Sequence, residues 1–449
     1  MASIALKSRW VSVVFAVTIS LAALFVFPMA ARAQFLFVDC SGTNPSAYPT
    51  INSALPNAGP GAFIAVTGTC NESVFLYGSN NLMLGAFFGQ TATLNGNLSI
   101  NNSQLVYVYG LNVTNAFGDG IDVNSSRSVV LDTCVSNGNA GNGLSTGQSS
   151  DVLINARGTF DSNGGFGILV GNNSYVNIGS WGGTTDISNN QSAGLWIGQG
   201  NFATLGNTHI ANNNSTTNLG LHVAIDMRGG GKAQMGSLYG PNVIENNPNG
   251  AVSLQENAEI SFFSILPNGQ NIIRNNGPFG VEAGFGSQVT LVGALITGHT
   301  GPGVDIYAHS QLYGTSQLQG LGTTQILNNG TAGDPLSAAI RVDGNSEVLL
   351  RGVNISQNNG PAILSLGNSS ADFSGVTFSG NVGVIACDST SAMVSDLAIS
   401  ARTPASGVNC NTAHSLGNRL ISVPAPAVPD STPWKAMHGM YQQRSSAQK

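Results

Sequence analysis

A group of charged and polar residues in the second half of the chain has the side chains that catalysis or metal binding would need. Glu282 and Asp305 carry carboxylates, the hard oxygen ligands that Ca²⁺ prefers. Two carboxylates at a suitable separation can also cleave a glycosidic bond. The group consists of Asp226, Arg228, Glu282, Asp305, Tyr307, Arg341 and Asp343. Any joint chemistry requires that these residues, which are far apart in the chain, share one surface.

A repeated four-residue signature places them on such a surface. It reads small, apolar, variable and usually apolar, as in Gly120-Ile121-Asp122-Val123 and Gly303-Val304-Asp305-Ile306. The copies follow one another at spacings of 21–36 residues, and the shortest spacings cluster near 23. Successive side chains of a strand point to opposite faces, so the second and fourth residues face a core and the third faces outward. Stacking the copies gives one outward column that contains Trp196, Asp226, Glu282, Asp305 and Arg341.

The repeat predicts an all-β fold, a β-solenoid with about 23 residues per turn plus loop insertions. The unit is shorter than a strand–helix–strand crossover, which takes about 30 residues, or a propeller blade, which takes about 40. Only 8% of the residues are charged, which excludes a helical bundle or coiled coil. The 21 acidic residues outnumber the 15 basic ones, so we expect no nucleic-acid partner.

A second periodic signal lies just before each signature, where an apolar residue is followed after one or two spacers by Asn. Asn adopts left-handed backbone angles more readily than most residues, and it hydrogen-bonds its own backbone in turns. Asn side chains that recur at a fixed phase can form a hydrogen-bonded ladder along a stack of turns. We expect a structural ladder formed by Asn190, Asn213, Asn247, Asn276, Asn329 and Asn359.

With this repeat, the chain resembles the right-handed parallel β-helix proteins of the pectin-lyase-like superfamily. The segment Tyr48-Pro-Thr-Ile-Asn-Ser-Ala-Leu55 resembles the short cap helix that opens many of them, and Cys70–Phe75 resembles a first turn. The resemblance covers roughly residues 35–400. We divide the chain into a signal peptide (1–33), a cap with the first strands (34–75), a parallel β-helix (76–400), and a closing segment with a Pro-rich flexible tail (401–449).

The N-terminal segment predicts export. Lys7 and Arg9 precede an apolar run, and Ala31-Arg32-Ala33 offers a cleavage site of small residues. After cleavage no membrane span is expected, so the protein would be secreted, periplasmic or on the cell surface. In such an oxidising compartment, Cys40 with Cys70 and Cys387 with Cys410 are candidate disulfides that each close a short loop.

The resemblance implies a calcium-dependent polysaccharide lyase as one hypothesis. Glu282 and Asp305 would hold Ca²⁺, and Arg341 would act as the catalytic base. A base must lose its proton, which Arg rarely does. The preferred interpretation is therefore an exposed salt bridge of Arg341 with Asp305 and Asp343. The binding residues of this strip would be Asp226, Arg228, Tyr307, Asp343 and Trp196.

Motifs of the related hydrolases and epimerases are incomplete. Asp119-Gly-Ile-Asp122 matches only part of a polygalacturonase segment, and the alginate epimerase motif is absent. We therefore expect a secreted protein that binds or associates with extracellular polysaccharide, without a recognisable complete catalytic set. An active calcium-dependent lyase or a glycoside hydrolase using the strip 226–343, and a structural or adhesive surface protein, remain alternatives. The sequence leaves the oligomeric state open.

Overall fold

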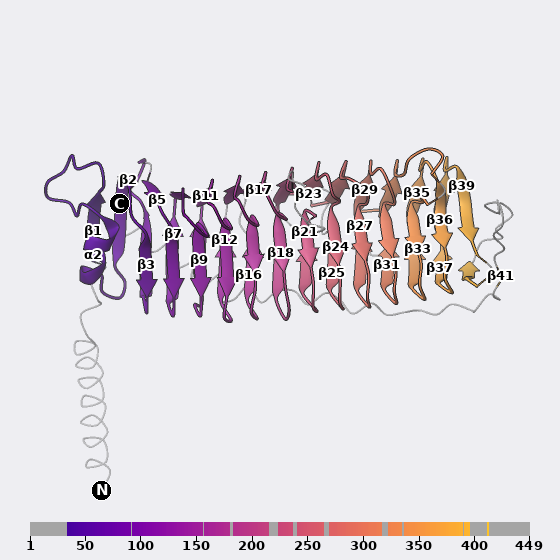
Figure 1. Ribbon diagram of the computed structural model, residues 1–449, viewed down its shortest axis with the longest axis horizontal. Coiled ribbons are helices and arrows are strands. Elements are labelled where there is room, and N and C mark those ends of the chain that lie inside the picture. Colours follow the sequence, from indigo (N-terminus) through magenta and orange to yellow (C-terminus); the bar gives the residue numbers. More distant parts are fainter. Residues whose placement is uncertain are drawn as a thin grey trace, which may run out of the picture.

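The computed structural model describes residues 34–412 except 91, 156, 180–182, 215–222, 237–239, 265–268, 317–321, 335, 389 and 396–410. The chain winds into the predicted parallel β-helix, an elongated rod in which strands of successive turns lie side by side (Figure 1). Each turn passes through three strands, one in each of three sheets, and we call these sheets A, B and C. Sheets A and B are joined at the N-terminal end because β2 (Phe63–Cys70) pairs with strands of both.

The strands of sheet C are β3 Val74–Tyr77, β6 Leu98–Asn101, β9 Ile121–Asn124, β12 Leu144–Gly147, β15 Ile168–Val170, β18 Leu195–Ile197, β21 Ile225–Met227, β24 Val252–Leu254, β27 Val281–Ala283, β30 Val304–Ile306, β33 Ile340–Val342, β36 Pro361–Ser365 and β39 Gly383–Cys387. With β2, those of sheet B are β5 Ala92–Asn95, β8 Leu111–Thr114, β11 Val135–Asn137, β14 Thr159–Asp161, β17 Thr185–Ser188, β20 Thr208–Ala211, β23 Asn242–Glu245, β26 Asn271–Arg274, β29 Leu295–Thr297, β32 Gln325–Leu327, β35 Asn354–Ser356 and β38 Thr377–Ser379. With β2, those of sheet A are β1 Phe35–Asp39, β4 Asn80–Ala86, β7 Gln104–Tyr109, β10 Val129–Asp132, β13 Asp151–Ile154, β16 Tyr175–Ile178, β19 Phe202–Leu205, β22 Lys232–Met235, β25 Glu259–Phe263, β28 Gln288–Val292, β31 Gln311–Thr315, β34 Glu347–Arg351, β37 Ser370–Ser374, β40 Ala392–Ser395 and β41 Asn411–Thr412.

The apolar residues of the signature fill the interior. In β9, for example, Ile121 and Val123 are buried, whereas Asp122 between them points outward and is only partly covered. Parallel pairing stacks equivalent residues in register, so Ile121 lies beside Leu144 of the next turn. The first residue of the signature is small because it packs against the corner of the turn. An added Cβ on Gly194 would lie 2.6 Å from the Ile210 side chain.

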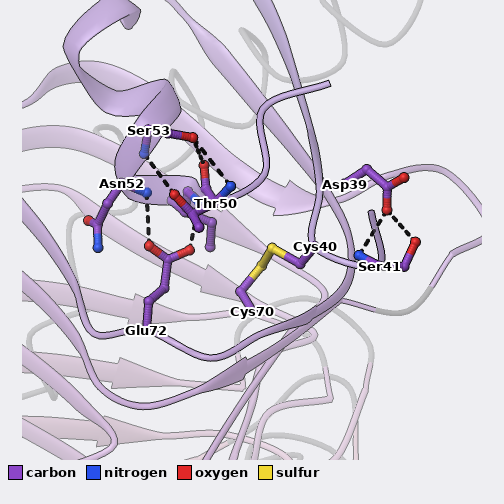
Figure 2. Close-up of a disulfide and its surroundings, with 9 residues drawn as sticks. Asp39, Cys40, Ser41, Thr50, Asn52, Ser53, Cys70 and Glu72 are labelled. Atoms are coloured by element: carbon purple, nitrogen blue, oxygen red, sulfur yellow. Dashed lines mark hydrogen bonds between the residues drawn. A yellow bond between two sulfur atoms is a disulfide. The ribbon is translucent and has the colours of Figure 1, made fainter. Parts of the chain in front are cut away.

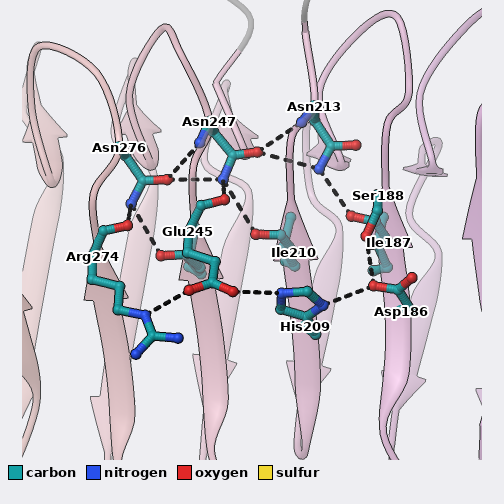
Figure 3. Close-up of polar contacts among 11 residues, drawn as sticks. Asp186, Ile187, Ser188, His209, Ile210, Asn213, Glu245, Asn247, Arg274 and Asn276 are labelled. Atoms are coloured by element: carbon teal, nitrogen blue, oxygen red, sulfur yellow. Dashed lines mark hydrogen bonds and ion pairs between the residues drawn. The ribbon is translucent and has the colours of Figure 1, made fainter.

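A ladder of Asn side chains runs along the corner between sheets B and C. The Asn190 side-chain amide donates to Asn213 Oδ1 at 2.9 Å. Figure 3 shows the next members of the ladder, where the Asn247 amide donates to Asn276 Oδ1 at 2.8 Å. Three residues that the sequence analysis missed, Asn139, Asn163 and Asn381, extend the ladder at its two ends.

The ladder position is the third residue after a buried residue of sheet B. This rule corrects one prediction, because Asn358, not Asn359, bonds Asn329 and Asn381. Gln357 adopts the left-handed angle (φ 59°) that Asn takes in other turns, so the ladder residue follows it directly. The second Asn of the pair, Asn359, instead donates to the Gly330 carbonyl.

One turn breaks the ladder. His299 lies between Asn276 and Asn329, where it is buried, and only its backbone N–H donates to Asn329 Oδ1, at 3.2 Å. Burial lowers the pKa of His299 to about 4, so its ring is neutral at ordinary pH.

The N-terminal end is closed by a short helix and a disulfide. Helix α2 (Ile51–Ala54), continued by a 3₁₀ turn at Leu55–Asn57, begins with a capping box in which Thr50 and Ser53 bond each other's backbone (Figure 2). The Glu72 carboxylate accepts from the first two helical N–H groups at 2.6 and 3.0 Å. The Cys40–Cys70 disulfide joins the segment before the helix to the end of β2.

At the C-terminal end, the last copy of the signature, Gly383-Val384-Ile385-Ala386, would place Ile385 on the outward face. Instead, Ile385 lies in the core beside Ile363, and Ala386 lies opposite Leu364. The strand is therefore displaced by one residue relative to the signature. Cys387 is buried and disulfide-bonded, and Cys410 lies outside the described residues. The predicted signal peptide and nearly all of the predicted tail also lie outside them. Within the described part of the chain, no helix has the length and apolar character needed to cross a bilayer.

Candidate functional site

The outward face of sheet C brings most of the candidate residues into one column. Trp196 lies beside Asp226, and Glu282 lies beside Asp305 on neighbouring strands. Asp305 pairs in register with Arg341 of the next turn, and the segment between them contains the strands β31 and β32 of sheets A and B. Asp226 is separated from Glu282 by the strand that carries Ser253, which is a distance of two strand spacings, or about 9.6 Å.

The Asp305–Arg341 pair is the centre of this column. Arg341 Nε donates to Asp305 Oδ1 at 2.8 Å, and Nη2 donates to Oδ2 at 2.5 Å. Both carboxylate oxygens are therefore occupied by one planar guanidinium. Burial raises the pKa of Asp305 to about 6, with further upward contributions from the Glu282 and Asp343 carboxylates and an opposing one from Arg341. Among the described residues, the salt bridge consists of Arg341 and Asp305, and the Asp343 carboxylate instead accepts from the Gly344 N–H at 2.7 Å.

Beside this pair, the Glu282 carboxylate accepts hydrogen bonds from two uncharged side chains. Tyr307 donates its hydroxyl proton to Glu282 Oε1 at 2.6 Å, and the Gln255 amide donates to the same oxygen at 3.2 Å and to the Tyr307 hydroxyl at 2.8 Å. The Tyr307 ring lies over Gly284, where an added Cβ would come within 2.5 Å of it. Burial, followed by the Glu282 carboxylate, raises the pKa of Tyr307 to about 12, so the hydroxyl stays protonated and a donor.

Asp226 and Arg228 form a second closed pair. The Arg228 guanidinium donates from Nε and Nη2 to the two oxygens of the buried Asp226 carboxylate, both at 3.1 Å. The bond to Asp226 raises the pKa of Arg228, so this side chain stays protonated. Trp196, one strand away, tilts against Phe166 with ring centroids 6.1 Å apart.

This arrangement does not fit the calcium site or the base of the lyase hypothesis. The two oxygens of Asp305 already accept from Arg341, and a divalent cation placed there would face that guanidinium. Among the described residues, the only grouping of three potential metal-ligating side chains is Cys40, Cys70 and Glu72, and its two cysteines form a disulfide. Arg341 Nε and Nη2 both donate to Asp305, so these two nitrogens are already engaged as donors. What the strip offers instead is hydrogen-bond donors and acceptors, with Asp226 and Asp305 each paired with an arginine.

A second polar network lies on the outward face of sheet B. His209 Nδ1 lies 2.9 Å from Asp186 Oδ1, and Nε2 lies 3.1 Å from Glu245 Oε1 (Figure 3). Arg274 donates to the other Glu245 oxygen at 2.5 Å. The bond to Asp186, together with Glu245, raises the pKa of His209. Each ring nitrogen faces a carboxylate of a neighbouring strand, so this network joins three successive turns. Its members lie outside the repeated signature, which is why the sequence analysis did not select them.

The sequence analysis also missed the N-terminal end of sheet C. Phe75 and Tyr77 project outward from β3 and are strongly exposed, and Asn101, Asp122 and Asn124 follow in the next two turns. Their alternation with buried Val74 and Leu76 was visible in the sequence. Their exposure could not be seen there, because it depends on whether another part of the chain covers them.

Comparisons with known proteins were made for both the sequence and the structure. No family model and no curated protein matches the sequence. The structure is similar to the A-module of the Azotobacter vinelandii mannuronan C-5 epimerase AlgE4, at 13% identity over 75% of this chain and 91% of that one, with a TM-score of 0.46. It is also similar to pectate lyase Pel9A, at 14% identity over 78% of each chain and a TM-score of 0.33. A third similar structure is the family 28 exopolygalacturonase of Yersinia enterocolitica, at 13% identity over 85% of this chain and 80% of that one, with a TM-score of 0.32.

Proposed function

We propose that this chain is an exported protein that binds polysaccharide along the outward face of sheet C without cleaving it. The observation that carries the proposal is the state of the strip 226–343. Its acidic and basic groups are closed into the pairs Asp305–Arg341 and Asp226–Arg228, while Glu282 is held by neutral donors. Such a surface can hydrogen-bond sugar hydroxyl groups, and among its described residues no three potential metal ligands come together.

The shape of the sheet supports a polymeric ligand. Sheet C has 13 parallel strands, so its 12 strand spacings extend over roughly 58 Å. One strand spacing is close to the length of one sugar ring, so an extended chain along the rod can meet an outward side chain at each turn. Export is supported by the Cys40–Cys70 disulfide, since such bonds persist in oxidising compartments.

The proposal is tested by native gel electrophoresis of the purified chain in gels that contain soluble polysaccharides, both neutral and acidic. We expect retardation by at least one of them, and weaker retardation when Trp196 and Tyr307 are replaced by Ala. The matched control is Gln311→Ala, an exposed position that faces outward on sheet A. Retardation that is equal in all variants would contradict a site on sheet C.

Activity is measured in parallel with and without Ca²⁺. The ultraviolet absorbance of unsaturated products reports a lyase, and new reducing ends report a hydrolase. We expect neither signal. Calcium-dependent product formation that is lost in Asp305→Ala would instead establish the lyase alternative. Absence of both binding and product would leave the rod itself, as a structural or adhesive element, as the function.

A further inference from the structure

The N-terminal end of sheet C carries two large aromatic side chains with little cover. Phe75 is 60% exposed and Tyr77 is 75% exposed. They are the two outward residues of β3, whose inward residues, Val74 and Leu76, are buried in the core. Exposed aromatic rings that gather at one place of a soluble protein indicate a contact surface, because their burial by a ligand is favourable.

The next two turns provide a polar floor in register with these rings. Tyr77, Asn101 and Asn124 form one outward column, and Phe75, Ser99 and Asp122 form the other. The Asn124 amide donates to both oxygens of Asp122 at 2.7 and 2.8 Å, and the Asn101 amide donates to Ser99 Oγ at 2.6 Å. These bonds orient the amides, so their carbonyl oxygens and the carboxylate are acceptors placed for hydroxyl donors.

The charge of this region selects against acidic ligands. The strands β3, β6, β9 and β12 contain neither Lys nor Arg. Burial, with a further contribution from Asp119, raises the pKa of Asp122, so its surroundings already disfavour a negative charge. A polyuronate would bring more carboxylates to these strands, which themselves offer no cation to receive them. An uncharged sugar carries no such penalty, and its rings have the apolar faces that stack on aromatic side chains.

We propose that the end of sheet C formed by β3, β6 and β9 is a binding site for an uncharged polysaccharide. The sugar rings stack on Phe75 and Tyr77, and the hydroxyl groups bond Asn101, Asp122 and Asn124. This inference rests on the proposed function in that both place the polymer on sheet C, and it adds the chemical class of the ligand and the place where binding is strongest.

The experiment measures dissociation constants of the full mature chain for neutral polymers (galactomannan, xyloglucan and mixed-linkage β-glucan) and for alginate and polygalacturonate. The double variant Phe75→Ser/Tyr77→Ser is compared with Phe88→Ser, which removes an equally exposed ring (59%) from the turn between β4 and β5. We expect binding of a neutral polymer that the double variant weakens at least about tenfold and the control leaves unchanged. The affinity should be the same in about 0.05 and 0.5 M salt, because no ion pair is formed.

Three outcomes would overturn the inference. In the first, the Phe75→Ser/Tyr77→Ser variant binds every neutral polymer as tightly as the unaltered chain, and only the Trp196→Ala/Tyr307→Ala variant loses binding. This outcome would leave the proposed function intact. Another is preferential, salt-sensitive binding of a polyuronate. The last is a dimer in sedimentation experiments that the double variant dissociates, which would make the aromatic pair an interface between two copies of the chain. If no polymer binds the unaltered chain, this inference and the proposed function fail together.

Discussion

Replacing His299 by Asn should complete the side-chain ladder and remove a weakness of the fold toward acid. In the neighbouring turn, Asn276 Oδ1 accepts from the backbone N–H and the side-chain amide of Asn247, at 3.1 and 2.8 Å. His299 has no carbonyl oxygen in its side chain, so it cannot accept the same two bonds from Asn276. An Asn at position 299 restores both, and each contributes about 1 kcal/mol to the free energy of unfolding.

The size of the effect depends on pH. At about pH 8 the two bonds together add about 2 kcal/mol to the free energy of unfolding, and the smaller side chain in a buried site costs about 1 kcal/mol of it. The variant should therefore be about 1 kcal/mol more stable than the unaltered protein at this pH. The pKa of His299 is about 4 in the folded protein, below the value of about 6.5 expected in the unfolded chain. The unfolded chain therefore binds more protons as pH falls below about 6.5. By about pH 5 this costs the unaltered protein about 2 kcal/mol of stability, which the variant does not lose, so its advantage grows to about 3 kcal/mol.

Urea denaturation followed by circular dichroism at about pH 8 and pH 5 measures this difference. The matched control is His309→Asn, an exposed residue with a left-handed φ of 66° that Asn also adopts. The control should keep the pH dependence of the unaltered protein. If His299→Asn loses as much stability between the two pH values as the unaltered chain does, the buried neutral histidine is not the cause and the reasoning is refuted.

Three further substitutions test the contacts that hold the turns together. His209→Gln should lower the free energy of unfolding below about pH 6.5 and lower it much less at alkaline pH. The reason is that the raised pKa of His209 stabilises the folded protein at low pH, and this contribution is lost as the pH rises. Equal losses at both pH values in urea titrations would contradict this. Arg341→Met should cost about 2–3 kcal/mol in the same titration by leaving the 6%-exposed Asp305 without its partner, and adding Asp305→Leu should recover part of the loss. Replacing Cys40 and Cys70 by Ser should cost about 3–4 kcal/mol, the loop-closure entropy of a 30-residue separation, and reductant should then shift the unfolding midpoint less than it does in the unaltered chain.

The repeat allowed much of the fold to be predicted. The alternation of apolar and polar residues in Ile121-Asp122-Val123 and its equivalents requires strands with one buried face, and the short period leaves room for strands alone. Stacking equivalent residues also predicted that Asp305 and Arg341 would be neighbours despite a separation of 36 residues. Such predictions succeed because side-chain direction in a strand is a local property with a period of two.

The exact register of the turns and the burial of individual side chains could not be predicted in the same way. Asn358 occupies the ladder position because it is the third residue after the buried Ile355, and the adjacent Asn359 is chemically identical. His299 takes a ladder position although its type gives no signal, since the position is set by the turns above and below it.

The sequence by itself therefore determined the parallel solenoid and the outward column of charged residues. Only the tertiary structure decided what each outward side chain meets. It closed Asp226 and Asp305 into arginine pairs and left Phe75 and Tyr77 open to solvent. The physical reason is that exposure and pairing depend on distances between turns and on the loops beside them, which a local pattern does not contain.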